Sequence, residues 1–316
     1  MRKTTIWLMV ATLLVILGTT VFGVAACSVG WDFTKFSTRK YETNTYEVHE
    51  EFSNISMQTD TADILFVPSD DGKCKVVCYE WERQKHSVAV QEGALIVTVA
   101  EHGFIGLGFG TPKITVYLPK AEYTSFLLKE STGDIEVPKD FQFQNVDISV
   151  SMGDVKFFAS TSEVVKIKAS TGNICVQEMS AGALDLSVST GKVTLSSVTC
   201  AGDITVGVST GKAYLTNITC KNIISTGNTG DLSLKNVFAA ERFSIKRTTG
   251  DVRFEGSDAG EIFVETDTGD VTGTLRSDKV FIVNTSTGKK EVPNTLSGGR
   301  CEVTTSTGDI KLKIQN

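Results

Sequence analysis

Residues 184–215 read LDLSVSTGKVTLSSVTCAGDITVGVSTGKAYL, and this stretch holds one short unit twice. The Ser-Thr-Gly-Lys run at 189–192 returns at 209–212. Apolar side chains stand seven and five residues before each glycine and two and four residues after it. A spacing of two is the period of a strand that turns alternate side chains inward. Each unit therefore predicts a strand, a glycine turn and a second strand.

The unit recurs along most of the 316-residue chain at a period of 19 or 20 residues. Its glycines are Gly133, Gly153, Gly172, Gly191, Gly211, Gly230, Gly250, Gly269, Gly288 and Gly308. A coil this short cannot bury its own apolar face, so it must stack on its neighbours. We therefore predict an all-β fold, a parallel β-solenoid (β-helix) of about ten coils spaced ~4.8 Å apart.

One further coil is predicted upstream, where Ile55 and Met57 precede Ala62 and where Ile64 and Phe66 follow it. The chain from 67 to about 121 is then an insertion, and its alternating pattern predicts strands at 74–79, 86–91, 94–100 and 113–118. An open solenoid end exposes a strand edge. We expect this N-terminal β insertion to cap that end.

The N-terminus predicts one transmembrane helix, because Ile6 to Ala26 is a mostly apolar run that can span a bilayer. Arg2 and Lys3 precede the run, and the next charge is Asp32. This asymmetry predicts a single-pass protein of the cell membrane with residues 32–316 extracellular. Two alternatives stay open: a cleaved signal peptide, and a lipoprotein lipidated at Cys27 after a lipobox-like 24–27.

The chain thus divides into a cytoplasmic tail and anchor (1–30), an N-terminal β region with the first coil and the strand insertion (31–125), and the repeat solenoid (126–316). Its 31 basic residues against 37 acidic ones give a net charge of −6. Nucleic-acid binders need a basic stripe, so no nucleic-acid partner is expected.

Together these features resemble a bacterial putative-adhesin family, membrane-anchored β-solenoid domains of unknown function. The matching segments are the N-terminal anchor, Trp31-Asp32-Phe33-Thr34-Lys35, Thr59-Asp60-Thr61-Ala62-Asp63-Ile64, Phe109-Gly110-Thr111-Pro112-Lys113 and the Ser-Thr-Gly-Asp series. The resemblance implies a cell-surface location and an adhesion or envelope role, and it carries over no catalytic residues. In three coils a lysine, Lys192, Lys212 or Lys289, replaces the aspartate after the glycine. This replacement argues against a chemical role shared by that position in all coils.

No catalytic, cofactor-binding or metal-binding residues are expected. The three histidines, His49, His86 and His102, follow no metal or nucleophile motif. Asp231, Asp251 and Asp270 follow glycines in successive coils, and there we expect each carboxylate to hydrogen-bond within its own turn rather than to bind calcium.

The seven cysteines are best interpreted as small buried residues, although Cys200 and Cys220 could also form a disulfide between adjacent coils. Two other local features stand out. The stretch 103–110, with four glycines and four apolar residues, predicts a hairpin tip that meets lipid or a partner, or folds back on the solenoid end. Ser225 and Gly227 stand where other coils have apolar residues, and a bulge or a wetter core is expected there.

These patterns favour a non-catalytic, adhesin-like interaction module of the cell surface, with a membrane contact through its helix and an envelope protein or glycan as partner. The first alternative is a β-solenoid enzyme acting on polysaccharides, which would need clustered carboxylates beside a groove. The second is an envelope sensor or assembly partner that acts through the membrane helix.

Overall fold

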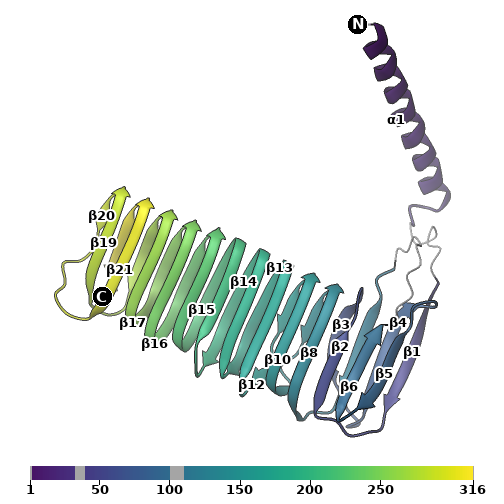
Figure 1. Cartoon of the computed structure of the whole chain (residues 1–316), viewed down its shortest axis with the longest axis horizontal. Coiled ribbons are helices and arrows are strands. Elements are labelled where there is room, and N and C mark those ends of the chain that lie inside the picture. Colours follow the sequence, from purple (N-terminus) through teal and green to yellow (C-terminus); the bar gives the residue numbers. More distant parts are fainter. Residues whose placement is uncertain (1, 33–39, 100–109, 316) are drawn as a thin grey trace.

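The computed structural model describes residues 2–32, 40–99 and 110–315, and it confirms the parallel β-solenoid of about ten coils with one N-terminal helix. Figure 1 shows the coils side by side as one long row, with β1, β4 and β5 at one end and β19–β21 at the other. Helix α1 spans Arg2–Ser28. The N-terminal strands are β1 (Tyr41–Val48), β2 (Asn54–Gln58), β3 (Asp63–Pro68), β4 (Cys74–Trp81), β5 (His86–Gln91), β6 (Ala94–Val99) and β7 (Lys113–Leu118).

From residue 122 onward the strands follow the predicted repeats, and in the middle of the rod single elements run through the glycine turn. The strands are β8 (Glu122–Thr132), β9 (Ile135–Val137), β10 (Gln142–Met152), β11 (Val155–Phe157), β12 (Ser160–Thr161), β13 (Val164–Ala181), β14 (Ala183–Cys200), β15 (Ile204–Thr229), β16 (Leu232–Thr249), β17 (Val252–Thr268), β18 (Val271–Leu275), β19 (Lys279–Thr287), β20 (Lys290–Glu291), β21 (Gly299–Thr307) and β22 (Ile310–Ile314).

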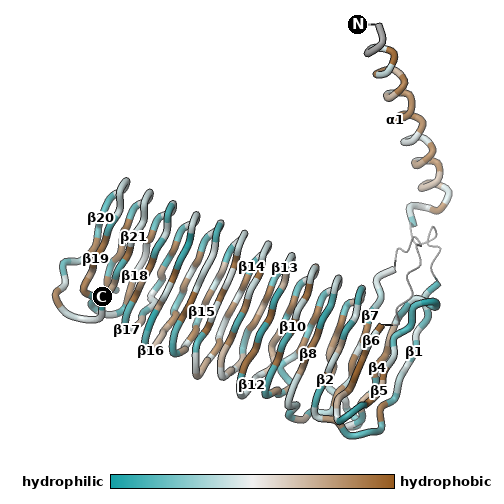
Figure 2. Tube along the Cα trace, viewed as in Figure 1, coloured by the Kyte–Doolittle hydropathy of each residue, from teal (hydrophilic) through white to brown (hydrophobic). Residues whose placement is uncertain are grey.

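Residues one repeat apart stack in register along the rod. Ile167 pairs with Leu186, and Leu186 pairs with Val206. All three side chains are buried, whereas Ser187 and Thr205 between them are half-exposed. The alternation runs the length of the solenoid as bands of apolar and polar residues (Figure 2). The inward columns form one continuous hydrophobic core that reaches from Val48 to Leu312.

The insertion caps the N-terminal end, as expected, and its four predicted strands are present. Strands β6 and β7 form a coil of their own, which pairs in parallel with β2 and β3 on their outer side. On their other side β2 and β3 pair with β8 and β9. Strands β4 and β1 extend the wall of β7 with antiparallel pairing, and β5 extends β6 in the same way. Strand β1 was not predicted.

The C-terminal end departs from sequence order. The last coil of the chain, β21 and β22, pairs with β17 and β18 on one side and with β19 and β20 on the other. The coil of residues 279–291 therefore forms the end of the rod. Lys290, which falls in an inward position of the repeat, is exposed because only one side of its coil is covered.

The repeat glycines have positive φ, from +126° to +157°. Their α-carbons face the backbone of the adjacent coil, so that a β-carbon on Gly211 would lie 1.7 Å from the carbonyl oxygen of Gly191. Only glycine tolerates both the torsion and the close approach. This column therefore fixes the turn geometry of every coil.

The aspartates after these glycines stabilise the stack, but not in the expected manner. We expected each carboxylate to bond within its own turn, whereas each accepts a hydrogen bond from the next coil. Asp231 Oδ1 accepts from the backbone N–H of Asp251 at 3.2 Å, and Asp251 Oδ1 accepts from Asp270 at 2.9 Å. The same ladder links Asp63, Asp134 and Asp154. A column of N–H donors thus offsets the like charges of neighbouring carboxylates.

This ladder predicts a small effect of Asp251→Asn and a larger one of Asp251→Ala. The amide oxygen of asparagine can still accept from Asp270, whereas alanine leaves that N–H to solvent and should cost about 1 kcal/mol of unfolding free energy. Chemical denaturation measures both. Thermal melting should give the same midpoint with and without calcium, and a large calcium-dependent rise that Asp251→Asn abolishes would contradict the hydrogen-bond role.

Candidate functional site

A shallow groove of about 640 Å³ crosses consecutive coils where the strands bend before the glycine turns. It begins at Gln58 and Thr59 and ends at Thr226–Asn228. The position two residues before the glycine is serine in five successive coils and then asparagine. These residues are Ser131, Ser151, Ser170, Ser189, Ser209 and Asn228. The inward residues of the same coils, such as Val188 and Val208, form an aliphatic floor.

The chemistry of the groove is that of a hydroxyl ladder above a hydrophobic strip. Its hydroxyls repeat at the ~4.8 Å spacing of the coils, and seven coils make it about 29 Å long. Two exposed lysines, Lys129 and Lys168, add positive charge. Among the lining residues the sole carboxylate is Glu130. An extended ligand with regular hydroxyl groups and apolar faces matches this surface.

Glu130 lies beneath the N-terminal end of the groove and is almost fully buried. It accepts hydrogen bonds from the hydroxyl of Thr59 and from the backbone N–H groups of Ala62 and Thr132. Burial outweighs these donors and raises the pKa of Glu130 to about 7. The residue therefore joins the first coil to the next and offers no exposed carboxylate to a ligand.

Arg247 lies beneath the C-terminal end of the groove. It explains why Ser225 and Gly227 stand where other coils have apolar residues. A β-carbon on Gly227 would lie 1.7 Å from Arg247 Nη1, so the missing side chain makes room for the guanidinium. Nη1 donates to the Thr226 carbonyl at 3.2 Å, Nη2 donates to Ser225 Oγ at 2.8 Å, and Nε has no partner in the described chain. Burial lowers the pKa of Arg247 to about 10, against the opposing field of Asp231. The core is polar here, as expected, and the groove ends above a buried cation.

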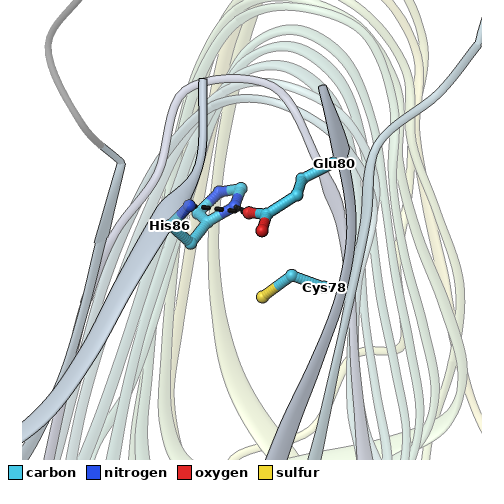
Figure 3. Close-up of side chains that lie close together, drawn as sticks. All are labelled: Cys78, Glu80 and His86. Carbon is cyan, nitrogen blue, oxygen red and sulfur yellow. Dashed lines mark hydrogen bonds and ion pairs between the residues drawn. The ribbon is translucent and has the colours of Figure 1, made fainter. Parts of the chain in front are cut away.

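A second cluster lies inside the N-terminal cap. Alternation along β4 turns Cys74, Val76, Cys78 and Glu80 inward, and the Glu80 side chain is 0% exposed. Glu80 Oε2 accepts from the backbone N–H of His86 and contacts His86 Nδ1, both at 2.6 Å. Figure 3 shows that His86 reaches across the cap interior toward Glu80, with Cys78 on the same strand as Glu80.

The surroundings of this cluster favour a structural role over a nucleophilic one. Asn44 donates to Glu80 Oε1 at 2.7 Å, and the Tyr46 hydroxyl donates to the same oxygen at 3.2 Å. Burial, with a smaller contribution from the Glu80 charge, raises the pKa of the Cys78 thiol to about 12. The thiolate is the nucleophilic form of cysteine, so the protonated Cys78 thiol is a poor nucleophile.

Five of the seven cysteines are small buried residues, as expected, whereas Cys27 is exposed and Cys175 is half-exposed. All seven are free thiols, so the alternative of a disulfide between Cys200 and Cys220 is not realised in this structure. Both lie in a buried column with alanines, Ala181 before them and Ala239 and Ala259 after. Cys301 pairs with Phe281, as its place in the repeat predicts.

The remaining candidates that the structure describes do not come together. His49 is exposed on the surface, His86 is in the cap, and His102 lies outside the described residues. The predicted hairpin tip at 103–110 also lies outside them except for Gly110. The sequence reasoning did not identify the cluster of Cys78, Glu80 and His86. Its signal was the alternation that places a charged residue, Glu80, in an inward column.

The N-terminal helix is long and apolar enough to cross a membrane from Thr5 to Ser28, and no residue of its apolar 18-residue window is buried. Its threonine hydroxyls donate to carbonyls one turn earlier, for example Thr12 to Leu8 at 2.9 Å. Such back-bonding satisfies the hydroxyls where water is absent. The helix fits a membrane anchor or a signal peptide.

The fold and its groove define a repeat protein of the β-solenoid class with an N-terminal apolar helix. The chain belongs to the Toastrack DUF4097 family, whose model matches residues 52–211 and 201–316. No curated protein matches its sequence.

Several solved structures from Parabacteroides and Bacteroides species are similar to this chain. A protein of Parabacteroides distasonis described as a putative lipid binding protein is 14% identical with a TM-score of 0.50, over 86% of this chain and 97% of that one. A putative adhesin from Parabacteroides merdae is 15% identical with a TM-score of 0.49, over 88% and 98% of the two chains. A putative adhesin from Bacteroides fragilis is 17% identical with a TM-score of 0.46, over 87% and 97%. At 14% identity, the likeness to the Parabacteroides distasonis structure concerns the fold alone.

Proposed function

We propose that the protein is a non-catalytic, adhesin-like interaction module of the cell surface and that the groove binds a linear envelope or surface glycan. The observation that carries the proposal is the ladder of serine hydroxyls, which repeats once per coil. Successive sugars of an extended polysaccharide would meet one coil each, with hydroxyls against serines and ring faces over the aliphatic floor.

The groove supports binding better than cleavage. Glycoside hydrolysis generally uses two carboxyl groups about 5–9.5 Å apart on either side of the scissile bond. Among the residues that line the groove, Glu130 is the sole carboxylate, and it is buried in hydrogen bonds to the first coil. A polysaccharide-active enzyme would need a second carboxylate that the groove does not provide.

Binding is tested with the full chain in detergent micelles against purified envelope and surface polysaccharides. Ser189→Trp should block the groove and lower the affinity at least tenfold, while Thr194→Trp, a half-exposed site beyond the glycine turn, should leave it unchanged. Thermal melting of both variants checks the fold. Equal binding by wild type and Ser189→Trp, or no retained polysaccharide, would refute the proposal.

We also propose that the mature protein keeps its helix, with residues 32–316 outside the cell, and that the parts 1–30, 31–125 and 126–316 are its domains. The basic residues before the apolar run and the acidic Asp32 after it support this orientation.

The anchor is tested by intact-mass measurement of protein from the membrane fraction. The expected mass includes Met1 to Ala26 or lacks only the initiator methionine. A mass that begins at a lipidated Cys27 would establish the lipoprotein instead, and a shorter soluble form would establish a signal peptide.

A further inference from the structure

We propose that Cys78, Glu80 and His86 form a zinc site that joins the two walls of the N-terminal cap. This inference is independent of the proposed glycan groove. It departs from the expectation, based on sequence motifs, that the chain has no metal ligands.

The donor atoms have the chemistry and spacing that zinc requires. Sulfur, imidazole nitrogen and carboxylate oxygen are its three protein ligand types. In this cluster the three donor atoms lie within 4.8 Å of one another, and all three residues are buried. Within the described part of the chain, this is the one such group of three or more His, Cys, Asp or Glu residues.

The charges also suit a divalent ion. With the Cys78 proton released on metal binding, a thiolate, a carboxylate and a neutral imidazole together carry two negative charges, which balance Zn²⁺ among three buried residues. Tetrahedral zinc at ~2.0–2.1 Å from nitrogen and oxygen holds those ligands about 3.3 Å apart. His86 Nδ1 and Glu80 Oε2, now 2.6 Å apart, would separate by about 0.7 Å as the metal replaces the hydrogen bond between them.

Supporting contacts orient Glu80 for this role. Asn44 donates to Oε1, and the single Tyr46 hydroxyl proton lies between Oε1 at 3.2 Å and the His86 carbonyl oxygen at 2.9 Å. These contacts hold the carboxylate and leave Oε2 directed at His86. Metal-binding carboxylates and histidines are commonly held by such outer hydrogen bonds. The three protein ligands leave one coordination position for water.

The location gives the metal a structural task. Strand β4 pairs with β1 and β7, and β5 pairs with β6, so the cluster connects strands that belong to opposite walls. The two strands share no ladder and are joined covalently only through the turn at 82–85. A metal bridge would close the cap where the solenoid core would otherwise open.

The experiment uses the full chain in detergent, in a Cys27→Ser background that removes the exposed thiol. After chelation, the protein is reloaded with Zn²⁺ or Co²⁺. We expect one equivalent of metal by elemental analysis, a melting temperature higher by about 5 °C or more with Zn²⁺, and a thiolate charge-transfer band with Co²⁺. Cys78→Ser should abolish the band and the shift. Cys74 is a second buried thiol on the inward face of β4, and Cys74→Ser should retain both.

Three results would overturn the site: substoichiometric metal in the folded wild type, bound Co²⁺ without a thiolate band, or a band that persists in Cys78→Ser. If Cys78→Ser folds poorly, His86→Gln provides the second variant, and its folded fraction by circular dichroism is measured before loading. Stoichiometric metal with an unchanged band in His86→Gln would likewise exclude the proposed ligand set.

Discussion

Replacing Gly211 with alanine should unfold the middle of the rod. The glycine has φ +135°, a torsion that L-residues rarely adopt, and an added β-carbon would lie 1.7 Å from the Gly191 carbonyl oxygen. The obstacle is backbone, which cannot swing away like a side chain. Strain of this kind belongs to the most destabilising class of substitutions, and we expect a loss of about 4 kcal/mol or more in unfolding free energy.

Gly207→Ala is the matched control, four residues earlier on the same strand. Its β-carbon would find its nearest atoms at 3.7 Å, an ordinary van der Waals contact, and its φ is not in the positive region. Denaturant unfolding of the two variants should therefore differ by several kcal/mol. Equal stability would mean that the glycine column does not fix the coil spacing.

Val206→Asp should have the second large effect, through charge rather than backbone geometry. Val206 is 0% exposed and stacks on Leu186 in the inward column. An uncompensated buried charge typically costs 3–5 kcal/mol, and the Arg247 guanidinium bound to Ser225, one coil away at the same repeat position, offsets only part of that cost. Part of the cost can be avoided by protonation, so the loss should shrink at low pH.

The comparison is Ser187→Asp, at a half-exposed position that pairs with Lys168 in the neighbouring coil. The new carboxylate would face solvent beside an opposite charge, so the change should stay within about 0.5 kcal/mol. Both variants are measured by urea denaturation at neutral and acidic pH. A stable, soluble Val206→Asp protein would contradict the inward assignment of this column.

The repeat was predictable because its period and its alternation act together. A glycine every 19 or 20 residues marks the turn, and apolar residues two apart mark the inward face. These two patterns together determine the register of most coils. The stacked Ile167, Leu186 and Val206 show the agreement. The same reasoning placed the strands of the cap and identified its position.

The order of coils at the two ends could not be predicted from this pattern. All coils present equivalent columns, so nothing in the period distinguishes Gly288 stacked on Gly308 from Gly288 stacked on Gly269. Strand β1 was missed because its inward residues are mostly half-buried and do not form a strongly apolar pattern. Arg247 was missed because the repeat reveals the vacancy at Gly227 but not the side chain that fills it.

The cap cluster shows a different limit. Glu80 could have been recognised as an inward charge from the alternation of Cys74, Val76 and Cys78. His86, however, begins a strand on the opposite wall, and only the turn at 82–85 brings it to face Glu80. Contacts between walls depend on how the chain crosses the interior, which strand periodicity does not encode.

The interleaved C-terminal coils affect how such a rod can come apart and how it can grow. Residues 299–314 are wedged between two other coils, so detaching the last segment must break two lateral interfaces instead of one. The C-terminal segment should therefore resist detachment when the chain is pulled. A copy of the repeat appended after residue 314 would reach the open end of the rod only by crossing the coil of residues 279–291, as the chain already crosses one layer between β18 and β19.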